Sequence, residues 1–500
     1  MDPIYLIIVI ILLGLAALDL VVGVANDAVN FLNSSIGSKV APLWVILTVA
    51  SVGVIIGTMF SSGMMEIARS GVFYPEKFTF PAIMILFLAV MLTDIILLDL
   101  FNTFGLPTST TVSLVFELLG AAVAIALFSV GTSGSGEHIG EFINSGKALA
   151  IIGGIFISIA IAFLAGSIIM YISRLIFSFN YNKVFKYLGA VWGGIALTAI
   201  TYFAIFKGLK GSVLVSTDML HYLEYNMATA LLYTFVGWTL FMGILQHLFR
   251  VKILKVIVLT GTAALAMAFA GNDLVNFIGV FMAGYDSFNI AQEVAATGGD
   301  ISQLHMGRLS EPVVANIWWL LGAGVIMVLA LWFSKKSRSV TETEVNLARK
   351  GDGVERFSSS PLSRSMVRSS LNLSKSIDKI MPVSVKEFID RRFEPVKLEN
   401  SASFDLIRAS VNLTIAALLI SLGTSLKLPL STTYVTFMVA MGSSLADRAW
   451  GRESAVYRIN GVLTVVAGWL LTALVAFTAS MLVGLFLMWG GKIAVAVMVL

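Results

Sequence analysis

The chain has 500 residues, of which 58% are hydrophobic and 12% are charged, and its mean hydropathy is +0.91. Soluble globular proteins are about half apolar and about a quarter charged, so this composition excludes an ordinary soluble domain. The sequence has no cysteine, which excludes disulfides and cysteine-ligated metals. The net charge of +4 does not indicate nucleic-acid binding. We therefore expect an all-α polytopic membrane protein.

Twelve apolar runs along the chain are candidate membrane-spanning helices, which need about 20 residues each. Their approximate bounds are 4–24, 40–60, 80–101, 108–130, 147–174, 184–207, 225–249, 252–272, 312–333, 404–426, 430–447 and 457–488. An apolar tail, 491–500, is too short to span. The first run has neither a basic segment before it nor a small-residue cleavage site, so we expect a retained helix and not a signal peptide.

Loop charges orient these spans by the positive-inside rule. Residues 131–146 contain Glu137 and Glu141 but no Lys or Arg, as expected outside the cell. Three links are basic, as expected in the cytoplasm: 174–186, 250–255 and 447–458. Counting from these links places the N-terminus outside, in a multi-pass protein of the plasma or inner membrane.

A polar motif at the end of the first run is repeated at the end of the eighth. Its polar residues are Asn26, Asp27 and Asn30 in the first copy and Asn272, Asp273 and Asn276 in the second. A carboxylate inside a membrane span is costly and by default marks an ion or substrate pathway. Carboxylate and Asn oxygens are also the ligands that hard cations prefer. We therefore expect cation ligands at Asn26, Asp27, Asn272 and Asp273; the alternative is helix capping at the membrane surface.

A second motif, Leu-Pro-x-Ser-Thr-Thr, also occurs twice, at 106–111 and at 428–433. Pro followed by Ser and Thr marks the start of a helix. The unpaired N–H groups and the positive dipole end of a helix N-terminus form an anion site. The predicted anion ligands are Ser109, Thr110, Thr111, Ser431, Thr432 and Thr433. The alternative interpretation is ordinary Ser/Thr capping of buried helices.

Two motifs that each occur twice indicate two versions of one unit. Seven crossings separate the two Asn-Asp motifs, so Asp27 and Asp273 approach from opposite sides, as in inverted-repeat transporters with broken helices at the midplane. The Ser-Thr-Thr copies lie farther apart than the Asn-Asp copies, which places additional sequence in the second half. The expected organisation is a first half at 1–210, the start of the second half at 211–333, a cytoplasmic helical insert at 334–403 and the remainder at 404–500.

Phosphate at neutral pH keeps a proton that it can donate to a carboxylate, whereas sulfate has none. Hydroxyl and amide donors beside two aspartates therefore favour phosphate, with Asn30 and Asn276 among its ligands. Gly131–Gly136 lacks the Gly-Lys-Ser/Thr ending of a phosphate-cradling loop, so transport would be driven by an ion gradient. Six unmatched ionisable residues form either a proton relay or structural ion pairs: Asp19, Asp94, Asp99, Glu117, Arg408 and Lys427.

At these motifs the chain resembles the inorganic phosphate transporter (PiT) family of sodium- or proton-coupled symporters. The family carries Gly-Ala-Asn-Asp-Val-Ala-Asn and Pro-x-Ser-Thr-Thr-His motifs in each half. The resemblance implies a symporter and not an enzyme, without an organic cofactor, that moves inorganic phosphate with Na⁺ or H⁺ by alternating access. The chain departs from the pattern in having Val112 and Tyr434 in place of the His, no Glu in 40–60, and Val280 in place of a Pro.

Other readings stay open at this point. The same architecture would suit a permease for sulfate or another oxyanion. A passive anion channel or an anion-sensing scaffold would need no cation ligands at Asp27 and Asp273. The expected partners are inorganic phosphate, Na⁺ or H⁺ and the lipid bilayer, and the sequence leaves open whether the chain forms a homo-oligomer.

Overall fold

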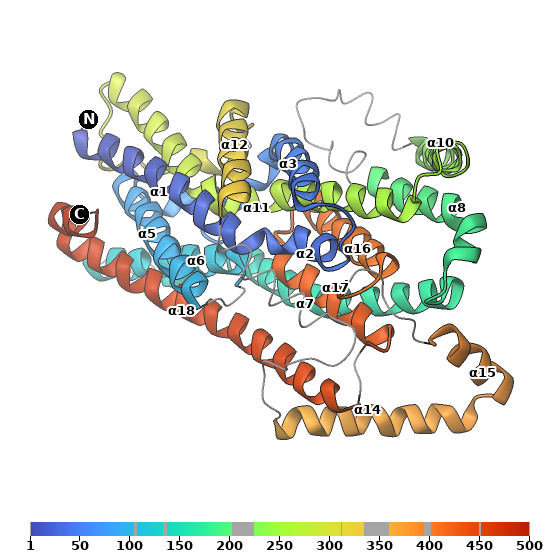
Figure 1. Cartoon of the computed structure of the whole chain (residues 1–500). Helices are drawn as coiled ribbons and strands as arrows, with labels where there is room; N and C mark the ends of the chain where they lie inside the picture. Colours follow the sequence, from blue (N-terminus) through green and yellow to red (C-terminus); the bar gives the residue numbers. More distant parts are fainter. Residues whose placement is uncertain are drawn as a thin grey trace.

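The computed structural model describes residues 2–104, 108–133, 138–202, 225–311, 313–334, 360–394, 402–449 and 452–499. These parts are almost entirely helical, and they contain two isolated bridges but no β-strand. Figure 1 shows long helices that run side by side, with both termini at the left. The predicted all-α membrane fold is confirmed.

The helices of the first half are α1 (Pro3–Asp27), α2 (Val29–Gly37), α3 (Leu43–Met59), α4 (Glu66–Ser70), α5 (Phe80–Phe104), α6 (Thr110–Ser133), α7 (Ser145–Phe177) and α8 (Asn182–Thr201). They are followed by α10 (Met227–His247), α11 (Ile253–Ala296), α12 (Ile317–Phe333), α14 (Pro361–Ile380), α15 (Val383–Arg392), α16 (Leu406–Ser425), α17 (Thr432–Ala446) and α18 (Arg452–Val499). Of the sequence features singled out above, Leu106, Pro107, 134–137 with Glu137, and 203–207 lie outside the described residues.

Each of the twelve predicted spans contains a helix, but not all of these helices are long enough to cross a membrane. In the described parts of the chain nine helices are long and apolar enough, or ten if α3 and Ser61–Ser70, bent by 59°, form one span. The remaining two are α12, with 17 residues, and α17, with 15 residues. The total of twelve crossings stays a prediction.

The expectation that an Asn-Asp motif closes its span is wrong for the second copy, whereas the first copy lies at the end of α1. Helix α11 continues through Asn272 and Asp273 to Ala296, and α1 passes into α2 through Ala28, which itself has helical dihedral angles. The motif side chains bond to other helices, so they do not cap their own helix. Val280 keeps the backbone N–H that a proline would lack, so α11 is not interrupted after the second motif.

The two halves exchange helices with each other. Helix α6 packs along α18 and α17 packs along α7, while α3 lies against α11 and α1 against α12. A Cβ atom on Gly120 would come within 2.2 Å of the Phe477 carbonyl oxygen, and one on Gly442 within 2.2 Å of the Phe163 carbonyl oxygen. Glycine thus permits backbone contact at both exchanged pairs. This pairing agrees with the predicted inverted repeat.

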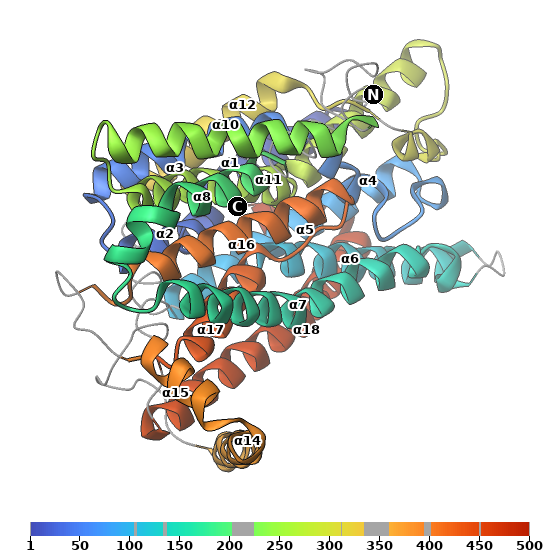
Figure 2. The ribbon, with the colours of Figure 1, turned by 90° about the vertical axis from the view of Figure 1, so that its right-hand side faces the viewer.

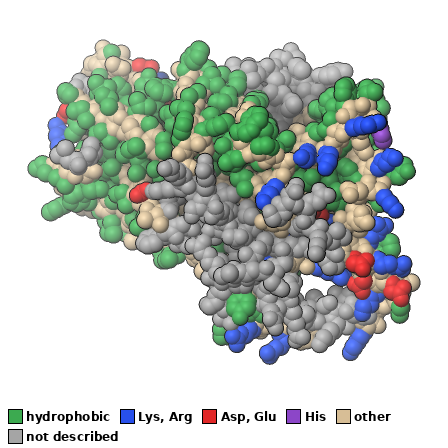
Figure 3. Space-filling model, viewed as in Figure 1, with side chains coloured by type: hydrophobic (Ala, Val, Ile, Leu, Met, Phe, Trp, Pro, Cys, Tyr) green, Lys and Arg blue, Asp and Glu red, His purple; other side chains and the backbone are tan. Residues whose placement is uncertain are grey.

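The molecule has two ends of different charge. At the terminal end, Lys492 pairs with Asp2 over 2.5 Å, and the N–H of Phe80 donates to the carbonyl of Leu304. At the opposite end, which we call the basic end, lie the links between α2 and α3, α7 and α8, and α10 and α11. Figure 2 shows the N-terminus and the α6–α7 turn at the right and the start of α8 and α15 at the left. In Figure 3, Lys and Arg gather at the right, while hydrophobic side chains cover the upper left.

The described part of the 334–403 insert forms two helices, α14 and α15, as the spacing of its apolar residues predicts. Val367 of α14 is buried. Arg448 pairs with Asp390 of α15 over 2.9 Å, and Tyr171 stacks on Phe393 with ring centroids 5.5 Å apart. Residues 335–359 and 395–401 of the insert lie outside the described part of the chain. Helix α15 and the residue after it therefore rest on α7 and on the segment after α17, while α14 packs against α18.

Candidate functional site

Two aspartates that are distant in the sequence meet in the middle of the helix bundle. Asp27 at the end of α1 is 0% exposed and Asp273 within α11 is 1% exposed. Each accepts a hydrogen bond from the Asn before it, from Asn26 Nδ2 over 2.9 Å and from Asn272 Nδ2 over 2.6 Å. Helix α1 reaches the site from the terminal end and α11 from the basic end, as the predicted inversion requires.

The Ser-Thr-Thr motifs begin helices at the predicted positions, since α6 starts at Thr110 and α17 at Thr432. The first hydroxyl of each motif is a helix cap. Ser109 Oγ accepts from the Val112 N–H over 3.2 Å, and Ser431 Oγ accepts from the Tyr434 N–H over 3.1 Å. For these two serines the capping alternative is correct.

The threonine hydroxyls donate to the aspartates, and they do so across the two halves. Asp27 accepts from Thr110 of its own half over 2.9 Å and from Thr433 of the other half over 3.3 Å. Asp273 accepts from Thr432 of its own half and, over 3.4 Å, from Thr111 of the other half. Each carboxylate therefore accepts hydrogen bonds from one threonine hydroxyl of each half.

Two further asparagines connect the halves in the same crossed manner. Asn30 Nδ2 donates to Thr432 Oγ1 over 3.2 Å and to Thr433 Oγ1 over 3.1 Å. Asn276 Nδ2 donates to Thr110 Oγ1 over 3.1 Å and to Thr111 Oγ1 over 3.0 Å. With these contacts the structure brings ten of the twelve predicted site residues into one cluster around Asp27 and Asp273, while the hydroxyls of Ser109 and Ser431 bond to their own helices.

The cluster is rich in oxygen atoms. The amide nitrogens of Asn26 and Asn272 donate to the carbonyl oxygens of Thr108 and Leu430 over 2.9 and 2.7 Å. Oδ1 of Asn26 and Oδ1 of Asn276 are buried and accept no hydrogen bond from any described residue. Carboxylate, amide, hydroxyl and backbone oxygens together form a ligand set that suits a hard cation such as Na⁺.

Sequence reasoning missed three threonines that support the cluster. Thr436 Oγ1 donates to Asn30 Oδ1 over 3.4 Å, and Thr424 Oγ1 donates to Asn272 Oδ1 over 3.2 Å. The carbonyl of Thr108 accepts from Asn26, as described above. Thr436 follows Thr432 by one helical turn, so a search for polar residues on the same face of α17 would have found it.

Three of the unmatched ionisable residues form a cluster without a basic partner. Asp19, Asp94 and Glu117 are all at least 98% buried, and Ser113 Oγ donates to Glu117 Oε1 over 2.7 Å. Oδ1 and Oδ2 of Asp19, Oδ1 of Asp94 and Oε2 of Glu117 have no hydrogen-bond partner among the described residues. In the described chain, no group of three or more His, Cys, Asp or Glu side chains has an arrangement that could hold a metal ion.

The two basic residues among the six unmatched ones, Arg408 and Lys427, form ion pairs, which is one of the two alternatives set out above. Arg408 and Arg174 both pair with the buried Asp447, and Arg174 also binds Asp405 over 2.9 Å. Burial raises the pKa of the Asp405 carboxyl, but the nearby Arg174 guanidinium outweighs this, so the net pKa lies below the usual value. Lys427 pairs with Glu66 over 3.0 Å.

The two positions where the resemblance predicts histidine are packed in apolar surroundings. Val112 is fully buried. The ring of Tyr434 stacks on Trp469, with centroids 3.8 Å apart, and its hydroxyl has no hydrogen-bond partner among the described residues. Neither side chain can accept a proton from a ligand as histidine would, so ligand binding here has to rely on the hydroxyl and amide groups.

Comparison with known proteins identifies the family of the chain. A family model described as the phosphate transporter family matches residues 23–341. A predicted phosphate permease of Thermococcus kodakarensis is 27% identical over 57% of this chain and 67% of its own length. Another from Pyrococcus furiosus is 26% identical over 57% of this chain and 66% of its own length.

A solved structure entitled "The sodium-dependent phosphate transporter" has the same fold. It superposes with a TM-score of 0.64, covers 96% of this chain and 99% of its own, and is 18% identical. Since the family model spans more than half of the sequence, including both Asn-Asp motifs and the first Ser-Thr-Thr motif, the chain belongs to the phosphate transporter family.

Proposed function

We propose that the chain is a secondary symporter that carries inorganic phosphate together with Na⁺, with H⁺ as the alternative coupling ion. The observation that supports this most is the crossed bonding at the site, in which each carboxylate accepts a hydrogen bond from a threonine hydroxyl of the opposite half. A movement of one half relative to the other changes the surroundings of both carboxylates at once. Alternating access of inverted-repeat transporters depends on this kind of movement.

The threonine hydroxyls give a physical reason for coupling the anion to the cation. Each hydroxyl has a single hydrogen, and Thr110 and Thr432 donate theirs to Asp27 and Asp273. A cation bound to a carboxylate neutralises its charge and competes for the same oxygens. The released hydroxyls can then donate to phosphate oxygens at the N-termini of α6 and α17. Cation binding therefore strengthens phosphate binding.

Na⁺ is the coupling ion that we favour. The site offers the unpartnered amide oxygens of Asn26 and Asn276 beside the two carboxylates, which suits a cation with several oxygen ligands. A proton would need only one carboxylate oxygen. We place the basic end, with the insert, in the cytoplasm of a plasma or inner membrane, and the N-terminus outside, by the positive-inside rule.

Uptake of isotope-labelled phosphate into proteoliposomes tests this function. With an inward Na⁺ gradient we expect phosphate to accumulate above its external concentration, and with an inward proton gradient alone we expect no accumulation. Competing sulfate should leave uptake unchanged. Strong competition by sulfate would favour an oxyanion permease, and equilibration without accumulation under either gradient would favour a passive channel.

Substitution of the carboxylates tests the role of the site. We expect Asp27→Asn and Asp273→Asn each to abolish concentrative uptake, because the cation loses its charged ligand. Asp300→Asn, at an exposed loop position of the terminal end, serves as the matched control and should transport normally. Normal accumulation in both site variants would contradict the proposed cation role.

A further inference from the structure

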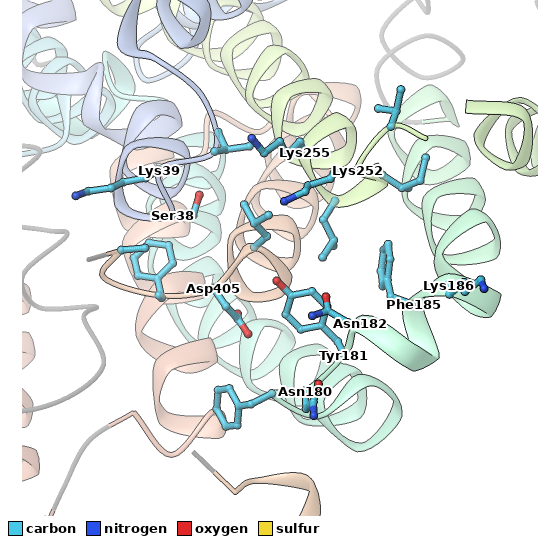
Figure 4. Close-up of a pocket in the computed structure, with 18 of the residues that line it drawn as sticks. Ser38, Lys39, Asn180, Tyr181, Asn182, Phe185, Lys186, Lys252, Lys255 and Asp405 are labelled. Carbon is cyan, nitrogen blue, oxygen red and sulfur yellow. The ribbon is translucent and has the colours of Figure 1, made fainter. Parts of the chain in front are cut away.

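A basic cavity of about 460 Å³ opens at the basic end of the molecule. It is lined by the end of α2, the α7–α8 and α10–α11 links, and the start of α16. Its lysines are Lys39, Lys186, Lys252 and Lys255. Figure 4 shows Lys252 and Lys255 on the α11 side of the cavity and Asp405 on the opposite side, below Ser38.

The charges around the cavity do not cancel. Asp405 is the single acidic residue among the described lining residues, and its carboxylate already binds Arg174 over 2.9 and 3.3 Å. Within the described chain, Lys186, Lys252 and Lys255 form no ion pair with any carboxylate. Such a concave positive surface raises the local concentration of anions.

A polar face of α2 leads from the site to this cavity. Asn30, Ser34 and Ser38 are spaced four residues apart, so their side chains share one face of the helix. Asn30 belongs to the site and Ser38 lines the cavity. At 1.5 Å per residue, about 12 Å of helix separates them. All three side chains are buried.

Polar groups of other helices continue this face. Asn412 Nδ2 of α16 donates to Ser34 Oγ over 3.3 Å, and Ser443 Oγ of α17 donates to Asn412 Oδ1 over 2.6 Å. Beside them, the hydroxyls of Ser35 and Thr262 lie 2.5 Å apart. Hydrogen bonds of this kind also hold membrane helices together, and that is the simpler explanation for each pair alone. A row of buried polar side chains along one face of α2, from the binding site to a basic cavity, is not required for helix association.

We propose that this face of α2 is one wall of the route between the site and the cytoplasm, and that the lysine cavity is the vestibule in which phosphate pauses. The inference rests on the proposed function and adds the path and the charge that guides the anion along it. In the described conformation the polar side chains bond to one another across the route. Helices α16 and α17 therefore have to move away from α2 before an ion can pass.

Cysteine labelling tests the route, because the natural sequence contains no cysteine. Ser34→Cys and Ser38→Cys, in the full chain reconstituted in phosphatidylcholine nanodiscs, are treated with a methanethiosulfonate reagent. We expect both to react, and the reaction at Ser34→Cys to slow several-fold when Na⁺ and phosphate are present together. The control is Ser158→Cys on α7, a similarly buried serine whose hydroxyl bonds to the Ile155 carbonyl. It should stay unreactive.

The ratio of reaction rates for an anionic and a cationic reagent measures the charge of the vestibule. At Ser38→Cys we expect the anionic reagent to be favoured, and the added double substitution Lys252→Gln and Lys255→Gln to lower the ratio several-fold. Lys183→Gln, in the same basic end but outside the cavity lining, is the matched control and should leave the ratio unchanged.

The outcomes separate this inference from the proposed function. Reaction at Ser34→Cys and Ser38→Cys no faster than at Ser158→Cys, in protein that still takes up phosphate, overturns the route. If the slower cysteine labelling requires phosphatidylglycerol in the nanodisc and does not occur with phosphate alone, that result assigns the cavity to a lipid headgroup and overturns the vestibule. If the wild-type chain takes up no phosphate but shows the expected labelling pattern, the proposed function is contradicted and the route is not.

Discussion

A threonine hydroxyl has one hydrogen to donate, and this limit governs the site. Thr110 and Thr432 donate to carboxylates of their own half, while Thr111 and Thr433 lie within 3.4 and 3.3 Å of the opposite carboxylate. Under the proposed function, the hydroxyls of Thr110 and Thr432 stay bonded to aspartate until a cation arrives, and those of Thr111 and Thr433 are shared between aspartate and the carbonyls of Leu430 and Thr108. The chain has Val112 and Tyr434 where the resemblance predicts histidine, so no imidazole can take over this task.

The crossed threonines give the first prediction. Thr111→Val and Thr433→Val remove a donor to phosphate but leave the carboxylates intact. We expect the KM for phosphate to rise about tenfold, since a hydrogen bond to a charged group contributes about 1.5–3 kcal/mol, while the Na⁺ concentration for half-maximal uptake does not rise. Thr93→Val, whose hydroxyl bonds within α5 to the Ala89 carbonyl, is the control. An unchanged KM in both site variants would argue against hydroxyl donation to phosphate.

We expect amide substitution of two buried carboxylates, Asp447 and Asp94, to lower the free energy of unfolding by different amounts. Asp447→Asn removes the buried carboxylate that Arg174 and Arg408 share, and Asp405 remains as the ion-pair partner of Arg174, so we expect a loss of about 3–5 kcal/mol in the free energy of unfolding. Asp94→Asn removes one of three neighbouring carboxyl groups that have no basic partner, so we expect a loss below about 1 kcal/mol. Thermal unfolding followed by tryptophan fluorescence measures both. Equal losses would contradict the idea that the basic partners of Asp447 cause the difference.

At the scale of helices, the side chains of the Asn-Asp motifs connect neighbouring helices. Helix α11 runs for 44 residues through its Asn-Asp motif because the side chains of Asn272 and Asp273 bond outward to Leu430, Thr424 and Thr432. The Ser-Thr-Thr motifs do mark helix starts, because Ser109 and Ser431 bond to their own backbone. Whether a polar residue ends a helix depends on where its hydrogen bonds go.

Two glycines of α7 test how the exchanged helices pack. A Cβ atom on Gly166 would come within 2.5 Å of the Val439 carbonyl oxygen of α17, whereas one on Gly154 would meet nothing within 4 Å. Gly166→Ala should therefore lower the unfolding temperature, because the two backbones are forced apart. Gly154→Ala should raise it slightly, since alanine favours the helix by about 1 kcal/mol. A stabilising effect of Gly166→Ala would contradict the backbone contact between α7 and α17.

At the scale of the whole molecule, the two ends of the bundle differ in charge. The terminal end carries Glu76, Glu141 and Asp300, and the basic end carries the lysine cavity. Because the two Asn-Asp motifs enter from opposite ends, the bonds around the site are equivalent when the two halves are exchanged. This equivalence is what an alternating-access transporter requires.

Membrane sidedness is directly testable in the cysteine-free chain. In intact cells we expect an impermeant thiol reagent to label Glu76→Cys at the terminal end and to leave Lys183→Cys at the basic end unlabelled. Permeabilised cells should show both labelled, which controls for accessibility. The reverse pattern in intact cells would place the N-terminus in the cytoplasm.

Much of the fold follows from the sequence because it depends on local properties. Apolar runs of membrane-spanning length, the starts of α6 and α17, and the duplication of two motifs can all be read within short windows. The continuation of α11 beyond Asp273 could not be read within a short window, because it depends on bonds to residues far along the chain. The threonines Thr424 and Thr436 lie outside the repeated motifs, so no repeat pointed to them.

The sequence by itself determined that the chain is a helical membrane protein, that it has two related halves, and that Asn-Asp and Ser-Thr-Thr are its polar centres. Only the tertiary structure decided which threonine meets which aspartate. Thr433 and Asp27 are 406 positions apart, and Thr111 and Asp273 are 162 apart. The pairing arises because α6 and α17 are each packed against a helix of the opposite half, and such packing depends on the shape of the whole bundle and not on any single stretch.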